Sequence, residues 1–171
     1  MLIVVSFYMN IDDLEKDILK HKIKSPETYQ DVIHLTIPFY MFYKNMLQET
    51  IHIQENVNAI SNSELDVLAS LIMSGNDDYV LSPTKLYERL LFTSGAITKV
   101  LKKLEDKKYI TRIDNQFDKR SKLVQITPLG KQICQETLKE VILYEERCFS
   151  VLTKEEQKSF KHIFTKLLKN M

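Results

Sequence analysis

The chain has few of the residues that build loops and covalent cross-links. It contains three glycines and four prolines among 171 residues, a composition that favours helices over many short strands. Its two cysteines, Cys134 and Cys148, stand about four turns apart on what reads as one helix, too far to bridge each other. We therefore expect no disulfide within one chain, and a reducing cytoplasm as its setting.

Long apolar runs are also missing. No stretch reaches the roughly 18 apolar residues that a membrane span needs, so we expect no contact with a membrane. Residues 1–9 are apolar, but no basic residue precedes them and acidic residues follow, which argues against a secretory signal. Two interpretations stay open: a short arm that packs on a partner chain, or a true start at Met9 that makes residues 1–8 an artefact.

Signatures of catalysis are absent from the sequence. It has no glycine-rich phosphate loop, no His-Glu-x-x-His helix and no nucleophile elbow. Its four histidines lack the spacing from Cys, Asp or Glu that a metal site requires. We therefore expect no enzyme activity, no bound metal and no cofactor.

What the chain does have is a strong separation of charge. The formal net charge is only +1. Residues 85–131 hold twelve basic and five acidic side chains, a net of +7, whereas residues 1–84 hold five and twelve, a net of −7. A local cationic patch is the electrostatic footprint of a protein that binds a polyanion. The other interpretation is a solvated helix face, but here the patch coincides with a fold pattern.

The fold pattern lies between residues 81 and 130. Ser82, followed by proline, is typical of a helix start, and Thr93 of the cap of the next helix. On that second helix, apolar residues recur with the spacing of a buried helix face. These residues are Ile97, Val100, Leu101 and Leu104. Two β-prone runs, residues 109–113 and 123–127, flank a basic turn. This order predicts a winged helix-turn-helix, which puts one helix in the DNA major groove and a hairpin beside it.

Helices are expected before this segment. Residues 11–23 read as a short acidic helix. The next helix should begin at Ser25, which is followed by proline, and run to about residue 57; Pro38 should kink or reset it. The broad apolar and aromatic surface of residues 29–47 is either core or the face that meets another subunit.

Three further helix starts carry a capping side chain. Ser61 or Ser63 should begin a helix before the winged segment, and Thr127 and Thr153 should begin two helices after it. Thr153 and Glu156 have the spacing of a capping box. The expected fold class is therefore mainly α with a small β-wing.

The segment of residues 81–130 resembles the MarR (multiple antibiotic resistance regulator) family, and the likeness extends more loosely over residues 28–170. Its most specific part is an Asp-x-Arg wing followed by a strand that ends in Thr-x-x-Gly. The residues that carry it are Leu81, Ser82, Leu86, Ser94, Thr98, Leu104, Glu105, Arg112, Asp118, Lys119, Arg120, Ser121, Leu123, Thr127 and Gly130.

The resemblance implies a homodimeric transcriptional regulator. Members are mostly repressors whose terminal helices interlock to form the dimer, and many release DNA when they bind small anions or phenolic compounds. The chain would then divide into an N-terminal arm with dimerisation helices (1–57), a winged helix-turn-helix DNA-binding lobe (58–130) and C-terminal dimerisation helices (131–171). The expected partners are double-stranded DNA with a pseudo-palindromic operator, a second copy of the chain, and a small anionic or phenolic effector. The alternative function is a winged helix that contacts another protein and binds no DNA.

The DNA-binding candidates lie on the exposed face of the recognition helix, at the starts of two helices and on the wing. Small hydrogen-bonding residues early on the helix suit base edges, and the lysines after them suit phosphates. By resemblance, Arg120 enters the minor groove and Asp118 holds its guanidinium; the alternative is an exposed wing salt bridge. The candidates are Ser82, Thr84, Thr93, Ser94, Gly95, Thr98, Lys99, Lys102, Lys103, Arg112, Asp118, Lys119, Arg120 and Lys122.

The effector pocket that the resemblance implies lies between the dimer helices and the DNA-binding lobe. Aromatic side chains with nearby cations would hold the ligand, although an aromatic stripe at helical spacing is also typical of plain core. The candidates are Phe39, Tyr40, Tyr43, Lys44 and Arg89. Relatives that sense hydroperoxides do so with a cysteine in the N-terminal helix, where this chain has none. Cys134 and Cys148 therefore read as small buried residues.

Two departures from the family pattern affect the recognition helix and the wing. The family has glycine before the wing strand, which ends the recognition helix in the left-handed conformation. Here Lys108 stands there, which predicts either a positive φ at a cost of about 1 kcal/mol or a different helix exit. The wing tip, with Asn115, Gln116 and Phe117, is less basic than usual, which predicts a different DNA affinity or preference.

Overall fold

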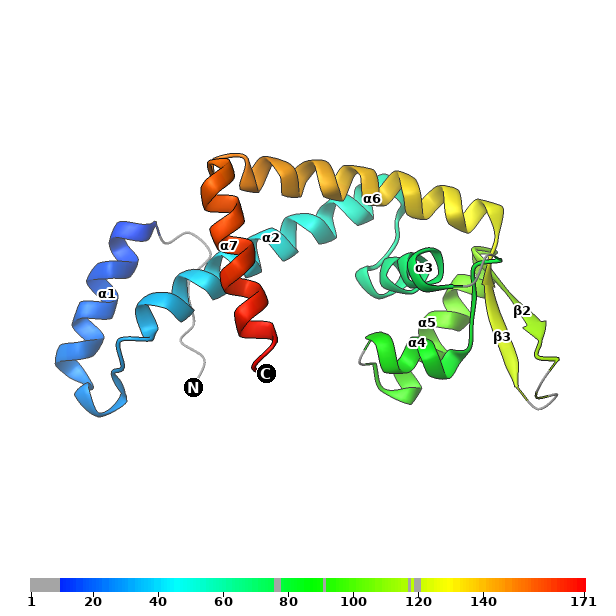
Figure 1. The fold of residues 1–171 in the computed structure, drawn as a ribbon, viewed down its shortest axis with the longest axis horizontal. Coiled ribbons are helices and arrows are strands. Elements are labelled where there is room, and N and C mark those ends of the chain that lie inside the picture. The colour runs from blue at the N-terminus through cyan, green and yellow to red at the C-terminus, as the bar shows by residue number, and fades with distance from the viewer. Residues whose placement is uncertain (1–9, 76–77, 91, 117, 119–120) are drawn as a thin grey trace. The chain divides into compact units, whose positions relative to one another are not determined.

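The computed structural model describes residues 10–75, 78–90, 92–116, 118 and 121–171. In these residues the chain is mainly helical with a small antiparallel sheet (Figure 1), which confirms the expected fold class. The chain forms two compact units, Met1–Thr50 and Ile51–Met171. The division into an arm, a DNA-binding lobe and terminal dimerisation helices stays a prediction.

The N-terminal unit holds α1 (Ile11–Lys24) and the first part of α2 (Ile33–Asn58). The side chain of Asn10 caps α1, since it accepts a hydrogen bond of 2.8 Å from the backbone N–H of Asp13. Leu14 and Ile18 of α1 are buried together with Ile37 of α2. This cluster is the core of the N-terminal unit.

One expectation about the start of α2 was wrong. Ser25 and the proline after it begin a 3-10 turn, Pro26–Thr28, and α2 begins only at Ile33. The Ser25 side chain makes no capping hydrogen bond there, so the cap that a helix start needs is missing. Pro38 lies inside α2, which continues through it, so the helix is not reset there; the kink that a proline causes inside a helix stays a prediction.

The C-terminal unit contains the expected helix-turn-helix and wing. The side chains of Ser61, Thr93, Thr127 and Thr153 each cap a helix, and Ser61 and Thr153 each form a complete capping box. The elements are α3 (Asn62–Ser74), β1 (Val80–Leu81), α4 (Pro83–Leu90), α5 (Ser94–Asp106), β2 (Ile110–Asp114), β3 (Lys122–Ile126), α6 (Pro128–Phe149) and α7 (Lys154–Leu168).

The sheet has the strand order β1-β3-β2, and both pairings are antiparallel. The wing hairpin pairs Ile110 with Ile126 at its base and Asp114 with Lys122 toward its tip. Strand β1 was not expected, because two residues are too few to show an alternating pattern. It places Leu81 opposite Val124 and so joins the start of α4 to the wing.

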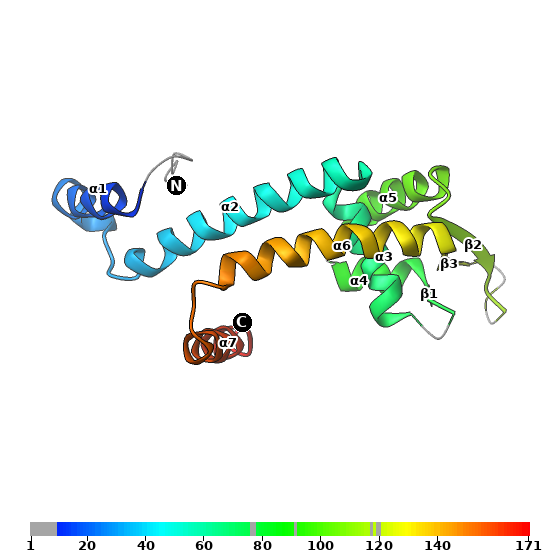
Figure 2. The same ribbon diagram turned by 90° about the horizontal axis from the view of Figure 1, so that it is seen from above.

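One apolar core holds the C-terminal unit together. It combines the inward faces of α3, α4 and α5 with the sheet and the start of α6. Helix α6 packs on α3, and Figure 2 shows α6 crossing it. Cys134 of α6 is fully buried in this core, as expected, and burial raises the pKa of its thiol to about 11. Cys148 is half-buried, and both cysteines are free.

None of the helices in the described part of the chain combines the length and the apolar character that a bilayer crossing requires.

Candidate nucleic-acid interface

Helix α5 has one buried and one exposed face, as its sequence spacing predicts. Its N-terminus is capped by the Thr93 hydroxyl oxygen, which accepts a hydrogen bond of 3.2 Å from the N–H of Ala96. Ile97, Leu101 and Leu104 are buried against the core. The core therefore fixes which side of α5 is presented to solvent.

The exposed side of α5 is small and polar at its start and basic along its middle. Gly95 and Thr98 are exposed near the start, and Lys99, Lys102 and Lys103 follow them. Among the described residues these three lysines have no carboxylate within ion-pair distance. Their charges are thus available to a polyanion. Ser94 begins the helix; its side chain is outside what the structure describes.

The start of α4 adds two hydroxyl groups. The Ser82 oxygen accepts a hydrogen bond of 3.2 Å from the N–H of Lys85, and Thr84 is exposed on the first turn. A capping hydroxyl accepts through its oxygen and keeps its hydrogen. Ser82 and Thr93 can therefore cap their helices and still donate to a phosphate oxygen.

One lysine of the basic segment, Lys107, forms an ion pair within the fold. Lys107, at the end of α5, places its Nζ 2.8 Å from Oε1 of Glu64 and 3.2 Å from the carbonyl oxygen of Ala59. Glu64 is only 3% exposed. Burial alone would raise the pKa of Glu64, but hydrogen bonds from Lys107 and Ser61 outweigh it and hold that pKa below its ordinary value. The sequence offered Ser61 or Ser63 as the cap of α3, but neither the capping box of Ser61 with Glu64 nor this partner 43 residues away was expected.

Lys108 has a φ of 60°, which confirms the left-handed exit from α5. The N–H of Lys108 donates to the carbonyl of Glu105 and the N–H of Tyr109 to the carbonyl of Leu104, both at 2.9 Å. This pair of bonds is a Schellman motif, whose left-handed position is usually glycine. The Thr127 hydroxyl also donates to the Lys108 carbonyl at 2.8 Å. Main-chain bonds therefore hold a lysine in a conformation that suits glycine.

The described wing cations are paired with carboxylates. Nε of Arg112 lies 3.8 Å from Oε2 of Glu105, and Lys122 pairs with Asp114. Asp118 is exposed. Lys119, Arg120 and Phe117 fall outside the described residues, so the expected pair between Asp118 and Arg120 stays a prediction.

The expected effector residues are divided between the two units. Phe39, Tyr40 and Tyr43 lie on α2 in the N-terminal unit and are 42%, 62% and 49% exposed, so they are not core within this chain. The ring of Phe39 is stacked 6.3 Å from that of Tyr43 and tilted 5.5 Å from that of Tyr40. Lys44 is exposed on the same helix.

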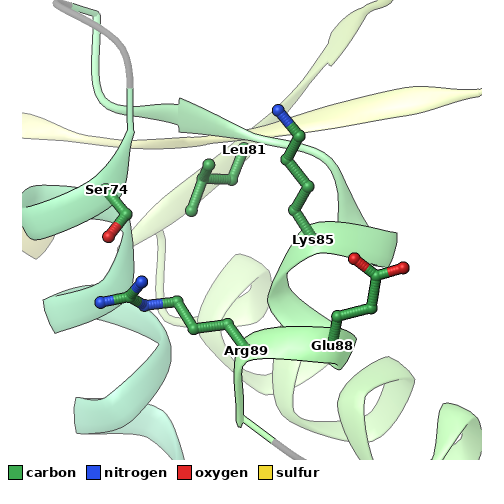
Figure 3. Close-up of a pocket in the computed structure, with 5 residues that line it drawn as sticks. All are labelled: Ser74, Leu81, Lys85, Glu88 and Arg89. Atoms are coloured by element: carbon green, nitrogen blue, oxygen red, sulfur yellow. The ribbon is translucent and has the colours of Figure 1, made fainter.

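Arg89 belongs to the C-terminal unit and lines a cavity of about 390 Å³ beside α4. Figure 3 shows its side chain directed toward Ser74, with Leu81 behind them and Lys85 and Glu88 on the same helix. The four α2 candidates do not line this cavity. Sequence reasoning missed Ser74, Lys85 and Glu88, because no motif marks residues that meet only through the packing of α3, β1 and α4.

Comparison with known proteins shows which family has this fold and this interface. A model of the MarR family matches residues 60–121. Over 162 residues the chain is 30% identical to the HTH-type transcriptional regulator PrsX of Escherichia coli. That alignment covers 95% of this chain and 96% of PrsX.

Two solved protein–DNA complexes share the fold. The S. aureus MepR–DNA complex has a TM-score of 0.68 at 26% identity and covers 78% of this chain and 95% of MepR. Sco3205, a MarR family transcriptional regulator from Streptomyces coelicolor solved in complex with DNA, has a TM-score of 0.72 and covers 86% of this chain and 92% of its own. Its identity of 18% shows likeness of fold alone.

Proposed function

The chain belongs to the MarR family of transcriptional regulators, and we propose that it represses transcription by binding a pseudo-palindromic DNA operator as a homodimer. The observation that carries the proposal is the exposed side of α5. Its small polar start leads into Lys99, Lys102 and Lys103, which have no carboxylate partner among the described residues. A buried apolar face on the same helix fixes that side outward.

In this proposal α5 is the helix that enters the major groove. Ser94, Gly95, Thr98 and Lys99 contact base edges or adjacent phosphates, because they lie in the first turns. Lys102 and Lys103 contact phosphates and supply affinity without sequence preference. The remaining contacts come from the start of α4, the cap of α5 and the wing, through Ser82, Thr84, Thr93, Arg112, Asp118, Lys119, Arg120 and Lys122.

The proposed homodimer is supported by apolar side chains that the single chain leaves exposed. Ile163, Leu167 and Leu168 of α7 are all more than half exposed, as is Tyr40 of α2. Large exposed apolar surfaces of this kind mark interfaces, and a two-fold dimer buries the same surface of both copies. Its two recognition helices would read half-sites about 10 base pairs apart, centre to centre.

The lining of the cavity beside α4 supports a second part of the proposal, that the protein releases DNA when a small anionic ligand binds. Lys85 and Arg89 lie one helical turn apart there, and neither has an ion pair among the described residues. Glu88, the Ser74 hydroxyl and the apolar side chain of Leu81 complete the lining. Its two cations against one carboxylate leave a net positive charge, which suits a small carboxylate or phenolate. Because α4 packs on α5, a ligand at this site would act next to the DNA-binding helix.

The test compares DNA binding by charge-removing variants in fluorescence anisotropy, on a duplex that the wild-type chain selects from a randomised library and on random duplex. Lys102→Ala is expected to weaken both complexes alike, and to lower the slope of log affinity against log salt by about one unit. Arg120→Ala is expected to weaken binding most on duplexes with A·T-rich flanks. Lys139→Ala, which removes the same charge from the exposed side of α6, is the matched control.

Three outcomes separate the hypotheses. A specific loss in Lys102→Ala, with Lys139→Ala unchanged, supports the proposed face. Equal losses in both lysine variants would mean that only overall charge matters. No affinity of the wild-type chain for any selected duplex would replace this function with the alternative, a winged helix that contacts another protein.

A further inference from the structure

Two of the three glycines of the chain are required by its own packing. A Cβ at Gly75 would lie 2.4 Å from the carbonyl oxygen of Leu71, and a Cβ at Gly130 would lie 2.0 Å from that of Tyr109. Both contacts are with backbone atoms that cannot turn aside. At these two positions the fold itself excludes any side chain.

The packing of the chain gives no such reason for the third glycine, Gly95. A Cβ at Gly95 would meet no atom within 4 Å, and its φ is not positive. It is nevertheless the second residue of α5, and glycine in a helix is destabilising relative to alanine because it loses more backbone freedom on folding. Among the described residues, nothing within the chain accounts for the absence of a side chain here.

The position of Gly95 on the helix suggests the reason. Gly95, Thr98, Lys99 and Lys102 follow the i, i+3, i+4, i+7 spacing of one helix face, and all four are exposed. They lie opposite the buried face of Ile97, Leu101 and Leu104. Gly95 is therefore the first member of the stripe that the proposed function turns toward DNA.

We propose that Gly95 is the point of closest approach between α5 and the DNA, where its missing side chain lets the helix backbone reach van der Waals contact with a base-pair edge in the major groove. This inference rests on the proposed function and adds a steric determinant to it. Glycine is the residue that permits close approach of a backbone to a ligand. A methyl group at this position would hold the start of α5 away from the groove floor and weaken the contacts of Thr98 and Lys99.

The test is Gly95→Ala, because stability and affinity are expected to move in opposite directions. The melting temperature should stay unchanged or rise by up to about 4 °C, since alanine favours the helix and meets no neighbour. Affinity for the duplex selected by the wild-type chain should fall about tenfold, the loss that one mismatched base pair causes. Gly95→Val, with a larger side chain, should bind more weakly still.

Two controls separate the steric role from a charge effect. Gly95→Ala removes no cation, so its salt slope should equal that of the wild-type chain, whereas Lys102→Ala should flatten the slope. Asp106→Glu adds one methylene at the other end of α5, where the side chain is also exposed, and should leave affinity unchanged.

Each outcome decides the inference. Wild-type affinity in Gly95→Ala, while the wild-type chain binds the selected duplex, would overturn the inference and leave the proposed function standing. A lowered melting temperature would show that the fold needs this glycine and would also overturn it. Failure of the wild-type chain to bind any duplex would sink the proposed function and the inference together.

Discussion

Glu64 is the residue on which the end of the recognition helix depends. One of its carboxylate oxygens accepts from the N–H and the hydroxyl of Ser61, and the other meets Nζ of Lys107. The same ammonium group also donates to the Ala59 carbonyl. Because the carboxylate is buried, this ion pair is shielded from solvent far better than a surface pair.

We expect Glu64→Gln to lower the free energy of unfolding by about 1–3 kcal/mol at neutral pH, since it removes the charge that holds Lys107. The folded-state pKa of Glu64 lies below its ordinary 4.5. Its stabilisation is therefore complete above pH 4.5 and is lost as the pH falls through the lower folded-state value. Thermal melts of the two proteins, from neutral pH to about pH 3, should show the difference in melting temperature shrinking.

The exposed pair of Arg112 and Glu105 provides the control. Its atoms are 3.8 Å apart and Glu105 is nearly half exposed, so Glu105→Gln should cost little. A constant gap between the wild-type chain and Glu64→Gln at every pH would contradict the assigned role of the charge.

At the scale of single elements, the exit of α5 offers a direct measurement. Lys108 holds a φ of 60°, where a side chain is strained and glycine is not. Lys108→Gly is expected to stabilise the protein by about 1 kcal/mol, less the extra freedom that glycine gives the unfolded chain. The denaturant midpoint should therefore rise. Lys103→Gly, in the regular part of α5, is the control, and its midpoint should fall.

Most helices could be predicted from the sequence because their signals are local. A capping side chain and a 3.6-residue apolar period lie within one element, so Thr93, Thr127 and Thr153 marked their helices correctly. The prediction of a long helix from Ser25 was wrong, because a serine followed by proline also begins a 3-10 turn. Strand β1 was missed because it owes its existence to pairing with β3, a contact between distant parts of the chain.

For the candidate site too, local patterns could be predicted from the sequence and tertiary contacts could not. Helical periodicity placed Thr98, Lys99 and Lys102 on the exposed side of α5, and the structure has them there. The role of Lys107 could not be predicted, since it depends on a tertiary neighbour, Glu64. The sequence offered Arg89 as a ligand-binding cation, but not Ser74 of α3, which lines the same cavity. Charge counts along a sequence cannot separate a cation that is held by a buried carboxylate from one that has no carboxylate partner.

At the scale of the whole molecule, the apolar side chains left exposed on α7 predict a second copy. We expect sedimentation at micromolar concentration to give a homodimer, and removal of residues 153–171 to expose apolar surface that the dimer buries and to cause aggregation. A monomeric wild-type chain would contradict the dimer. A truncated chain that stays monodisperse and binds DNA would contradict the role of α7.

The close contact at Gly130 determines which substitutions evolution can tolerate at this position. Every missense mutation of its codon adds a Cβ, and that atom would lie 2.0 Å from the Tyr109 carbonyl, where the wing strand leaves α5. A Cβ at position 95, by contrast, would meet no atom of the chain within 4 Å. Selection should therefore purge nearly all variants at codon 130 for loss of the protein, but variants at codon 95 only for loss of their operator. Descendants of this chain that read new DNA sequences are expected to have changed at codon 95 while keeping glycine at codon 130.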